Sequence, residues 1–215
     1  MFYEGYDVSI NKEEQDSEYS TVYAEIIEFD GFSDKEYQSE LNMSIRKDVE
    51  DAITSFDALA QDAAEKLPQG VKSTLNITQK VRRNTNDLIS FITEQYIYTG
   101  GAHGTTEWYP QTIDVTASNP HKLILGEIFS DEDYVNKLNT IINTMVKENP
   151  EKYSELWAKP EITSENENRF YMTDTDLVIY FPPYELSYYA KGFIEFPIPL
   201  DELNPILNDR YKTTK

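Results

Sequence analysis

Cysteine is absent from this sequence of 215 residues, and histidine occurs only twice. The lack of cysteine excludes disulfide bonds, thiolate nucleophiles and thiolate metal ligands. Neither His103 nor His121 has a second histidine at the short spacing of a histidine-based metal site. The sequence therefore predicts no metal site and no cofactor.

Long apolar runs are also missing. No stretch approaches the roughly 20 apolar residues that a membrane-spanning helix needs. Residues 1–5 have neither the basic start nor the apolar continuation of a signal peptide.

The familiar catalytic motifs do not occur either. There is no Gly-x-Ser-x-Gly nucleophile elbow and no phosphate-binding loop. The glycines of residues 100–104 follow a predicted strand, but no helix follows them, so positive-φ turns explain them better than a dinucleotide site. His103 could serve as a base, but a turn histidine with a hydrogen-bonded ring is favoured. With 39 acidic residues, carboxylate pairs are unavoidable and indicate no chemistry, so we predict a protein that is not an enzyme.

Negative charge is what the sequence has in excess. The formal net charge is −20. Residues 1–68 hold 18 acidic and 5 basic residues, a net of −13, and the remainder carries −7. Such a field repels nucleic acid and anionic membranes and attracts a basic macromolecule. Solubility alone is the alternative interpretation of the charge.

The patterning predicts an α+β fold, with a largely antiparallel sheet or sheets and two main helices packed on them. Residues 1–19 are expected to form an acidic, loosely ordered lead-in. The first helix is predicted from a capping box, with Ser33 as N-cap and Glu36 at the third position, to about Leu67. The second is predicted to start at residues 130–133, with acids in its first turn. Alternation of side chains predicts strands at 21–29, 73–81 and 87–99, and further strands are expected at 107–115, 169–172, 177–181 and 192–198. The strands at 169–172 and 177–181 are expected to pair as a hairpin.

Residues 181–192 form a segment with two prolines and three tyrosines between two predicted strands. Tyrosine buries a large area at low entropic cost, so a stiff loop that carries it makes a good contact surface. An equally open interpretation is that these rings pack over the edge of a sheet.

Three segments resemble a known family. Residues 98–104 (Tyr-Thr-Gly-Gly-Ala-His-Gly) are similar to the Y-x-G-G-A-H-G signature of the paired bacterial domains DUF4163 and DUF3298. Residues 123–129 and 170–186 are similar to two later blocks of that family, in the same order. The resemblance covers about residues 20–205. It implies a DUF4163-like subdomain at 20–110 and a DUF3298-like subdomain at 111–208, interlocked as one globular unit.

The family includes the outer domain of RsiV-type anti-sigma factors and the N-terminal region of PdaC-type peptidoglycan deacetylases. The resemblance implies an extracytoplasmic sensor that binds lysozyme and thereby triggers proteolytic release of a sigma factor of the extracytoplasmic-function class. It would lie at the outer face of the cell membrane, and its membrane anchor and sigma-binding segment are not in this chain. The expected partner-binding residues are Tyr98, Thr99, His103, Pro182, Pro183, Tyr184 and Tyr188.

An accessory domain that holds peptidoglycan for a cell-wall enzyme is the alternative. The His-x-x-x-His metal pair that polysaccharide deacetylases of this kind need is missing from the sequence. By either hypothesis, this chain is expected to be non-catalytic.

Overall fold

The computed structural model describes residues 5–116 and 120–213, which form two compact units. The first unit comprises Met1–Asp87 and Ile92–Tyr109, and the second comprises Leu88–Phe91 and Pro110–Lys215. The structure is 29% helical and 35% strand, which confirms the predicted α+β class. No helix among the described residues is both long enough and apolar enough to cross a bilayer.

A six-stranded sheet provides most of the first unit. Its strands lie in sequence order: β1 (Asp7–Asp16), β2 (Ser20–Asp30), β3 (Ser73–Asn84), β4 (Leu88–Tyr98), β5 (Thr105–Asp114) and β6 (His121–Lys122). The β1–β2 pair is antiparallel, but β2 and β3 are parallel. A parallel pair requires a crossover, and the helix α1 supplies it.

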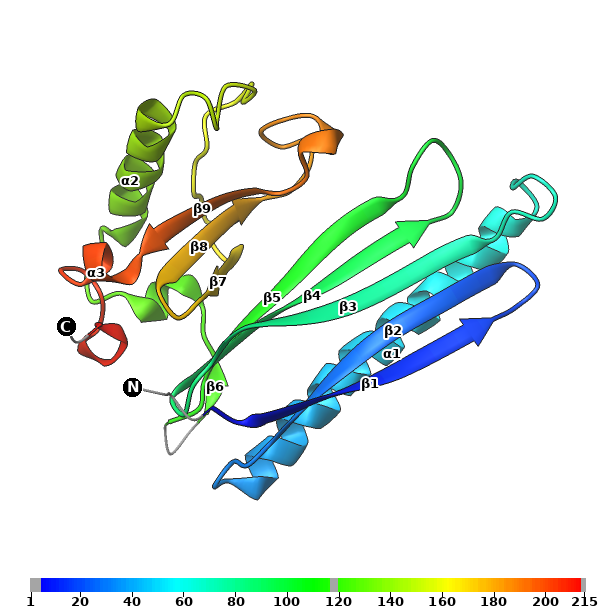
Figure 1. Ribbon diagram of the computed structural model, residues 1–215, viewed down its shortest axis with the longest axis horizontal. Helices are drawn as coiled ribbons and strands as arrows, with labels where there is room; N and C mark the ends of the chain where they lie inside the picture. Colours follow the sequence, from blue (N-terminus) through cyan, green and yellow to red (C-terminus); the bar gives the residue numbers. More distant parts are fainter. Residues whose placement is uncertain (1–4, 117–119, 214–215) are drawn as a thin grey trace. The chain divides into compact units, whose positions relative to one another are not determined.

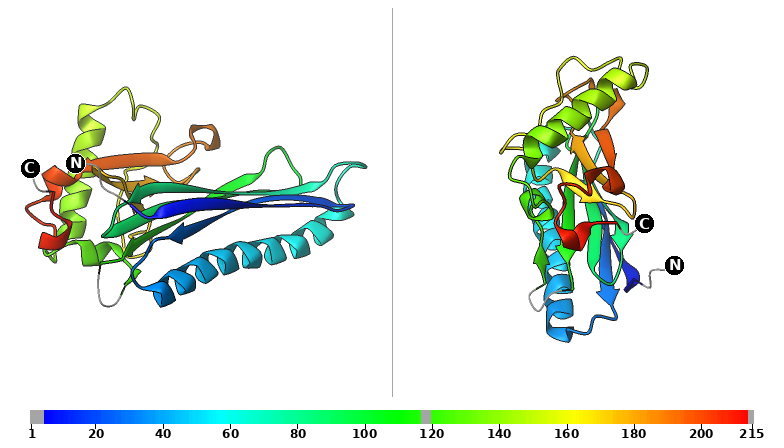
Figure 2. Two further views of the ribbon diagram at one scale, coloured as in Figure 1. Left: turned by 60° about the horizontal axis from the view of Figure 1, so that its bottom comes forward. Right: turned by 90° about the vertical axis from the view of Figure 1, so that its left-hand side faces the viewer.

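The helix α1 (Lys35–Ala64) covers one face of this sheet (Figures 1 and 2). Its buried residues recur every three or four positions and so share one side of the helix: Leu41, Ile45, Val49, Ile53, Phe56, Ala60 and Ala63. They pack on the buried side chains of β2 and β3. The predicted cap was wrong by one residue, because Asp34, not Ser33, accepts the hydrogen bond from the Tyr37 amide.

The expectation of a loosely ordered lead-in was wrong for most of residues 1–19, because residues 7–16 form β1. All ten residues of β1 pair in register with β2, from Asp7 opposite Asp30 to Asp16 opposite Thr21. The strand lies at the edge of the sheet and is exposed almost throughout, so its sequence carries no apolar alternation. Its charged residues are typical of an edge strand protected against further pairing.

The second unit is built on a smaller antiparallel sheet, β7 (Phe170–Met172), β8 (Asp176–Phe181) and β9 (Ile194–Pro199). The predicted β7–β8 hairpin is confirmed. The helix α2 (Tyr134–Glu148; Figure 1) contributes Leu138 and Ile142 to the hydrophobic core that also contains Phe196 of β9. α2 begins at Tyr134, later than predicted, so the acids at 131–133 precede its first turn.

Short helices complete the second unit: η1 (Leu125–Ile128), η2 (Tyr189–Lys191), α3 (Leu200–Leu203) and η3 (Asp209–Tyr211). η2 lies in the connection between β8 and β9, where the tyrosine-rich segment was noted.

Candidate partner-binding surfaces

The aromatic loop, residues 182–189, leaves the end of β8 and is anchored at its base. Leu186 and Ser187 are buried. The Ser187 hydroxyl donates to the Glu155 carbonyl oxygen over 2.9 Å, and the Trp157 amide donates to the Leu186 carbonyl oxygen over 3.0 Å. These contacts fix the loop to the segment before it in the second unit.

Large rings are exposed above this anchor. Trp157 is 58% exposed, Tyr184 57% and Tyr188 41%. The Trp157 Nε1 donates to the Glu185 carbonyl oxygen over 3.2 Å, and the Tyr188 hydroxyl donates to Glu155 Oε1 over 2.7 Å. The rings are thus held in place while their faces stay accessible. Tryptophan and tyrosine are enriched among the residues that contribute most to binding at the centres of protein interfaces.

Tyr184 has a backbone conformation that tyrosine rarely adopts. Its φ of 71° is the only positive value at a non-glycine residue in the described chain. The left-handed conformation costs a residue with a Cβ on the order of 1–2 kcal/mol. Two hydrogen bonds hold it: the Tyr184 amide donates to the Ser187 carbonyl oxygen, and the Glu185 amide donates to that of Pro182. Strain that the surroundings maintain is characteristic of functional sites.

The second predicted loop, residues 98–104, joins β4 to β5 in the first unit and exposes the side chains of Thr99, Ala102 and His103. The Tyr98 hydroxyl donates to the Gly101 carbonyl oxygen over 3.4 Å, and the ring nitrogen Nδ1 of exposed His103 lies 2.8 Å from the Gly104 carbonyl oxygen. Gly100 and Gly101 have positive φ, as predicted for turns. Gly104 serves packing instead, because a Cβ there would lie 2.5 Å from both the Ile97 carbonyl oxygen and the Tyr96 ring.

The predicted residues therefore fall into two groups, one in each unit. Pro182, Pro183, Tyr184 and Tyr188 share the aromatic loop. Tyr98, Thr99 and His103 share the β4–β5 loop. Sequence reasoning missed Trp157, whose only signal is that a large ring stands among polar residues outside any periodic pattern.

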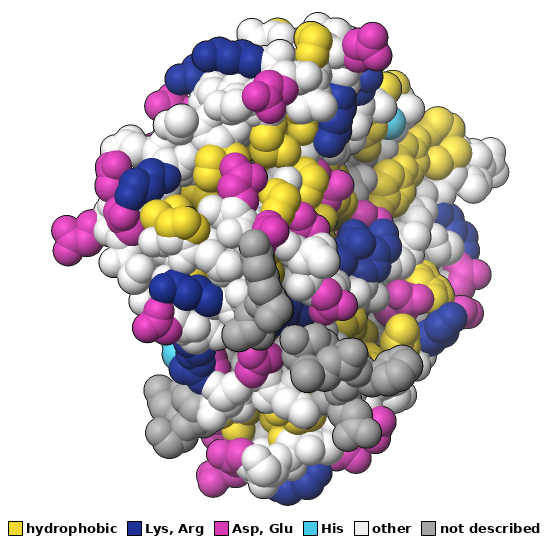
Figure 3. All heavy atoms as spheres, turned by 60° about the vertical axis from the view of Figure 1, so that its left-hand side comes forward, with side chains coloured by type: hydrophobic (Ala, Val, Ile, Leu, Met, Phe, Trp, Pro, Cys, Tyr) yellow, Lys and Arg dark blue, Asp and Glu magenta, His cyan; other side chains and the backbone are white. Residues whose placement is uncertain are grey.

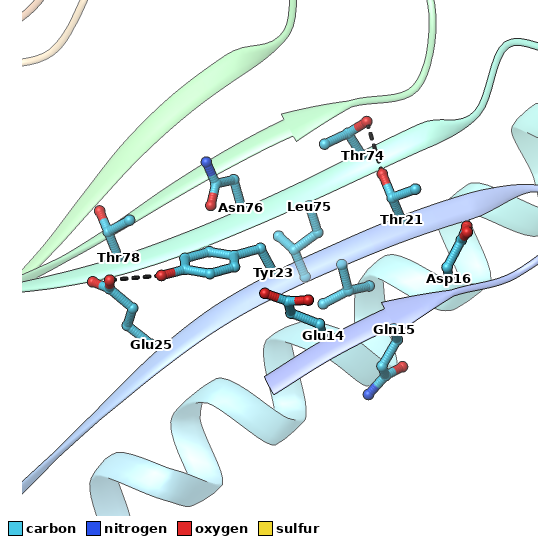
Figure 4. Close-up of a pocket in the computed structure, with 11 residues that line it drawn as sticks. Glu14, Gln15, Asp16, Thr21, Tyr23, Glu25, Thr74, Leu75, Asn76 and Thr78 are labelled. Carbon is cyan, nitrogen blue, oxygen red and sulfur yellow. Dashed lines mark hydrogen bonds between the residues drawn. The ribbon is translucent and has the colours of Figure 1, made fainter. Parts of the chain in front are cut away.

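A groove that no sequence motif indicated lies on the first unit's sheet face opposite α1. Its volume is about 800 Å³, and eleven residues of β1, β2 and β3 line it (Figure 4). Tyr23 lies across it, with its hydroxyl donating to Glu25 Oε1 over 2.8 Å. The threonines Thr21 and Thr74 meet through their hydroxyls at 3.3 Å.

Acidic residues exceed basic ones in both units. The first unit holds 21 acids and 9 bases, and the second holds 18 and 10, so the nets are −12 and −8. On the face drawn in Figure 3, basic side chains lie among acidic ones and form no continuous basic patch. No group of three or more His, Asp or Glu side chains that could hold a metal ion occurs in the described ranges.

Two families match this α+β chain. Residues 13–106 match the family described as "Deacetylase PdaC", and residues 126–201 match the "Protein of unknown function (DUF3298)" family. The resemblance predicted from the sequence is confirmed by these two matches.

Two curated proteins of Bacillus subtilis (strain 168) are similar over most of the chain. The peptidoglycan-N-acetylmuramic acid deacetylase PdaC is 25% identical over 217 residues, covering 94% of this chain but only 45% of that protein. The anti-sigma-V factor RsiV is 29% identical over 209 residues, covering 93% of this chain and 70% of RsiV. This chain thus spans less than half of the deacetylase.

Solved structures share the fold. A DUF3298 family member from Bacteroides fragilis superposes with a TM-score of 0.73 at 17% identity, over 96% of this chain and 95% of that one. A DUF3298 family protein from Pseudomonas aeruginosa has a TM-score of 0.69 at 15% identity, over 99% of each chain.

Proposed function

We propose that this chain is the non-catalytic outer sensor domain of an anti-sigma factor. It binds lysozyme outside the cell membrane, and binding triggers the proteolysis that releases a sigma factor of the extracytoplasmic-function class. The anti-sigma-V factor RsiV, which is similar over most of this chain, supports the proposal. A membrane anchor and a sigma-binding segment would belong to parts of the protein beyond this chain.

The observation that carries the proposal is the aromatic loop. A strained, exposed tyrosine beside an exposed tryptophan gives a rigid apolar contact in a chain whose net charge is −20. C-type lysozymes are basic, so the charge of the chain attracts them from solution and the rings provide the specific contact.

Titration of the chain with a C-type lysozyme, at low and at moderate salt, tests the proposal. Tyr184→Ala and Trp157→Ala are each expected to weaken binding about 30-fold, corresponding to about 2 kcal/mol for a ring at an interface centre. Tyr109→Ala is the matched control, because Tyr109 is 45% exposed but lies in the first unit.

The circular dichroism spectrum of each variant shows whether it is folded. Absence of a complex at both salt concentrations would refute the proposal. Equal loss of binding in the Tyr109 control would refute the choice of surface.

A second candidate is an accessory domain that holds cell-wall glycan. The similarity to a peptidoglycan deacetylase and the groove of the first unit favour it. Sedimentation with insoluble peptidoglycan tests this candidate, and a chain that stays entirely in the supernatant would exclude it.

A further inference from the structure

The groove on the open face of the first unit is lined by groups that suit a sugar. The Tyr23 ring offers a surface on which a pyranose can stack, and its hydroxyl is held by Glu25. Around it lie short side chains that can both donate and accept hydrogen bonds: Thr21, Thr74, Asn76 and Thr78. The apolar side chains Val22 and Leu75 also line the groove, so it offers a sugar both hydrogen-bonding groups and apolar surface.

The carboxylates of the groove define the ligand further. Glu14, Asp16 and Glu25 line it. Glu14 lies directly opposite Tyr23 in the β1–β2 register and takes part in no ion pair within the described chain. Asp16 is paired with Lys72, and Lys12 lies 5.8 Å from the centre of the Tyr23 ring. Three carboxylates against two lysines leave an excess of negative charge beside the ring.

This charge discriminates among cell-wall sugars. A sugar that carries a carboxylate would be repelled, and a neutral N-acetylated sugar would offer Glu14 no charged partner. A sugar with a free amine is protonated near neutral pH, so it can pair with Glu14 while its ring stacks on Tyr23. Removal of the acetyl group from an N-acetylated amino sugar produces such an amine.

We propose that this groove binds a glycan of amino sugars whose amines are free, the product of deacetylation rather than its substrate. The proposal deepens the second candidate function by naming a site and a ligand. It is independent of lysozyme binding, which involves the aromatic loop of the other unit.

Calorimetric titration of the whole chain with two hexasaccharides tests this proposal at about pH 6, where a sugar amine is charged. One is a β-1,4-glucosamine hexamer, and the other is its fully N-acetylated form. The amine form is expected to bind at least about 10-fold more tightly.

Three variants locate the site. Tyr23→Ala is expected to weaken binding of the amine form about 10-fold, and Glu14→Gln about 5-fold. Glu40→Gln, on the exposed face of α1, is the control and should have no effect. If Tyr23→Ala fails to fold, Tyr23→Phe replaces it, and loss of the hydrogen bond to Glu25 should weaken binding about 3-fold.

Three outcomes overturn the proposal: no binding of the amine form, equal binding of both hexamers, or binding unchanged in all of the Tyr23 and Glu14 variants. A hexalysine peptide that binds as tightly, with the same sensitivity to the variants, would assign the groove to a basic protein segment instead. If the amine hexamer binds but the chain does not sediment with peptidoglycan, the groove assignment stands and the second candidate function fails.

Discussion

In the first unit, the groove on the sheet holds Tyr23 among threonines and carboxylates, whereas the second unit exposes Trp157 beside Tyr184 of the aromatic loop. The first surface is a groove that combines polar and apolar groups, and the second is an exposed group of aromatic rings. The two units also differ in net charge, which is −12 for the first and −8 for the second. Surfaces that differ in this way suit different ligands, a hydroxylated and charged one in the first unit and a protein surface in the second.

The two loops predicted as contacts also differ in how they are made rigid. The β4–β5 loop is shaped by glycines, and its tyrosine hydroxyl bonds within the loop. The aromatic loop is held by hydrogen bonds from outside it and keeps Tyr184 strained and exposed. The glycines of the family signature therefore shape the β4–β5 loop, whereas the aromatic loop keeps a strained tyrosine exposed.

The largest expected effect tests whether packing determines the β4–β5 loop. Gly104→Ala places a Cβ 2.5 Å from the Ile97 carbonyl oxygen, and backbone cannot move aside as a flexible side chain would. We expect the free energy of unfolding to fall by about 3 kcal/mol. Urea denaturation measures it.

Gly101→Ala provides the matched control, because its φ of 91° is unfavourable but no atom lies within 4 Å of the added Cβ. Its expected cost is about 1 kcal/mol. Similar losses in both variants would mean that backbone conformation, and not packing, requires Gly104.

A smaller loss of stability is expected from Asp114→Ala in the second unit. This buried carboxylate accepts hydrogen bonds from Arg210 over 2.7 Å, from the Tyr211 hydroxyl over 3.0 Å, and from the amide and hydroxyl of Thr116. Alanine leaves these donors unpaired, at a cost of about 2 kcal/mol. Denaturation of the exposed-site variant Asp174→Ala is the control, and equal stability of the two variants would show that the network contributes nothing.

Strong local periodicity made part of the fold predictable. The buried residues of α1 repeat every three or four positions, and the strands of the β7–β8 hairpin are short, apolar and separated by turn residues. β1 could not be found in this way, since its stability comes from hydrogen bonds to β2 and not from buried side chains. The choice between Ser33 and Asp34 as the cap depends on which side chain accepts the hydrogen bond from the Tyr37 amide, and periodicity does not report this.

The candidate surfaces were predictable only in part. Composition left two interpretations of residues 181–192 open, a contact loop or rings packed over a sheet edge. The strain at Tyr184 results from hydrogen bonds that close only in the folded loop. The groove depends on the parallel pairing of β2 with β3, which brings Thr21 beside Thr74 across 53 positions of sequence. Trp157 joins the aromatic loop through two hydrogen bonds that no local pattern encodes.

The salt dependence of the binding rates distinguishes long-range attraction by charge from direct contact by the aromatic loop. Suppose that negative charge attracts a lysozyme and the aromatic loop holds it. Raising salt from about 20 to 200 mM should then slow association about 10-fold, because salt screens the long-range attraction between the two proteins. Dissociation should change less than about 2-fold. Stopped-flow or surface-binding kinetics measure both rates. A larger change in dissociation would mean that carboxylates form the contact and that Tyr184 was the wrong choice.

The smallest expected effect concerns the core of the second unit, where β8 contains a buried phenol. Burial raises the pKa of Tyr180 to about 12, from an ordinary value of 10.0. Between these two pH values the unfolded chain has released this proton and the folded chain has not, so unfolding is favoured as pH rises. Tyr180→Phe has no proton to release. Its free energy of unfolding, measured in urea, should therefore fall less steeply than that of the parent chain from pH 10 to 12, by about 1 kcal/mol at pH 11.

The two proteins are first compared at pH 7, where the group is neutral in both states, and the difference found there is subtracted. Identical slopes above pH 10 would show that the Tyr180 hydroxyl reaches water in the folded chain and that the second unit's core is more open at β8 than its packing indicates.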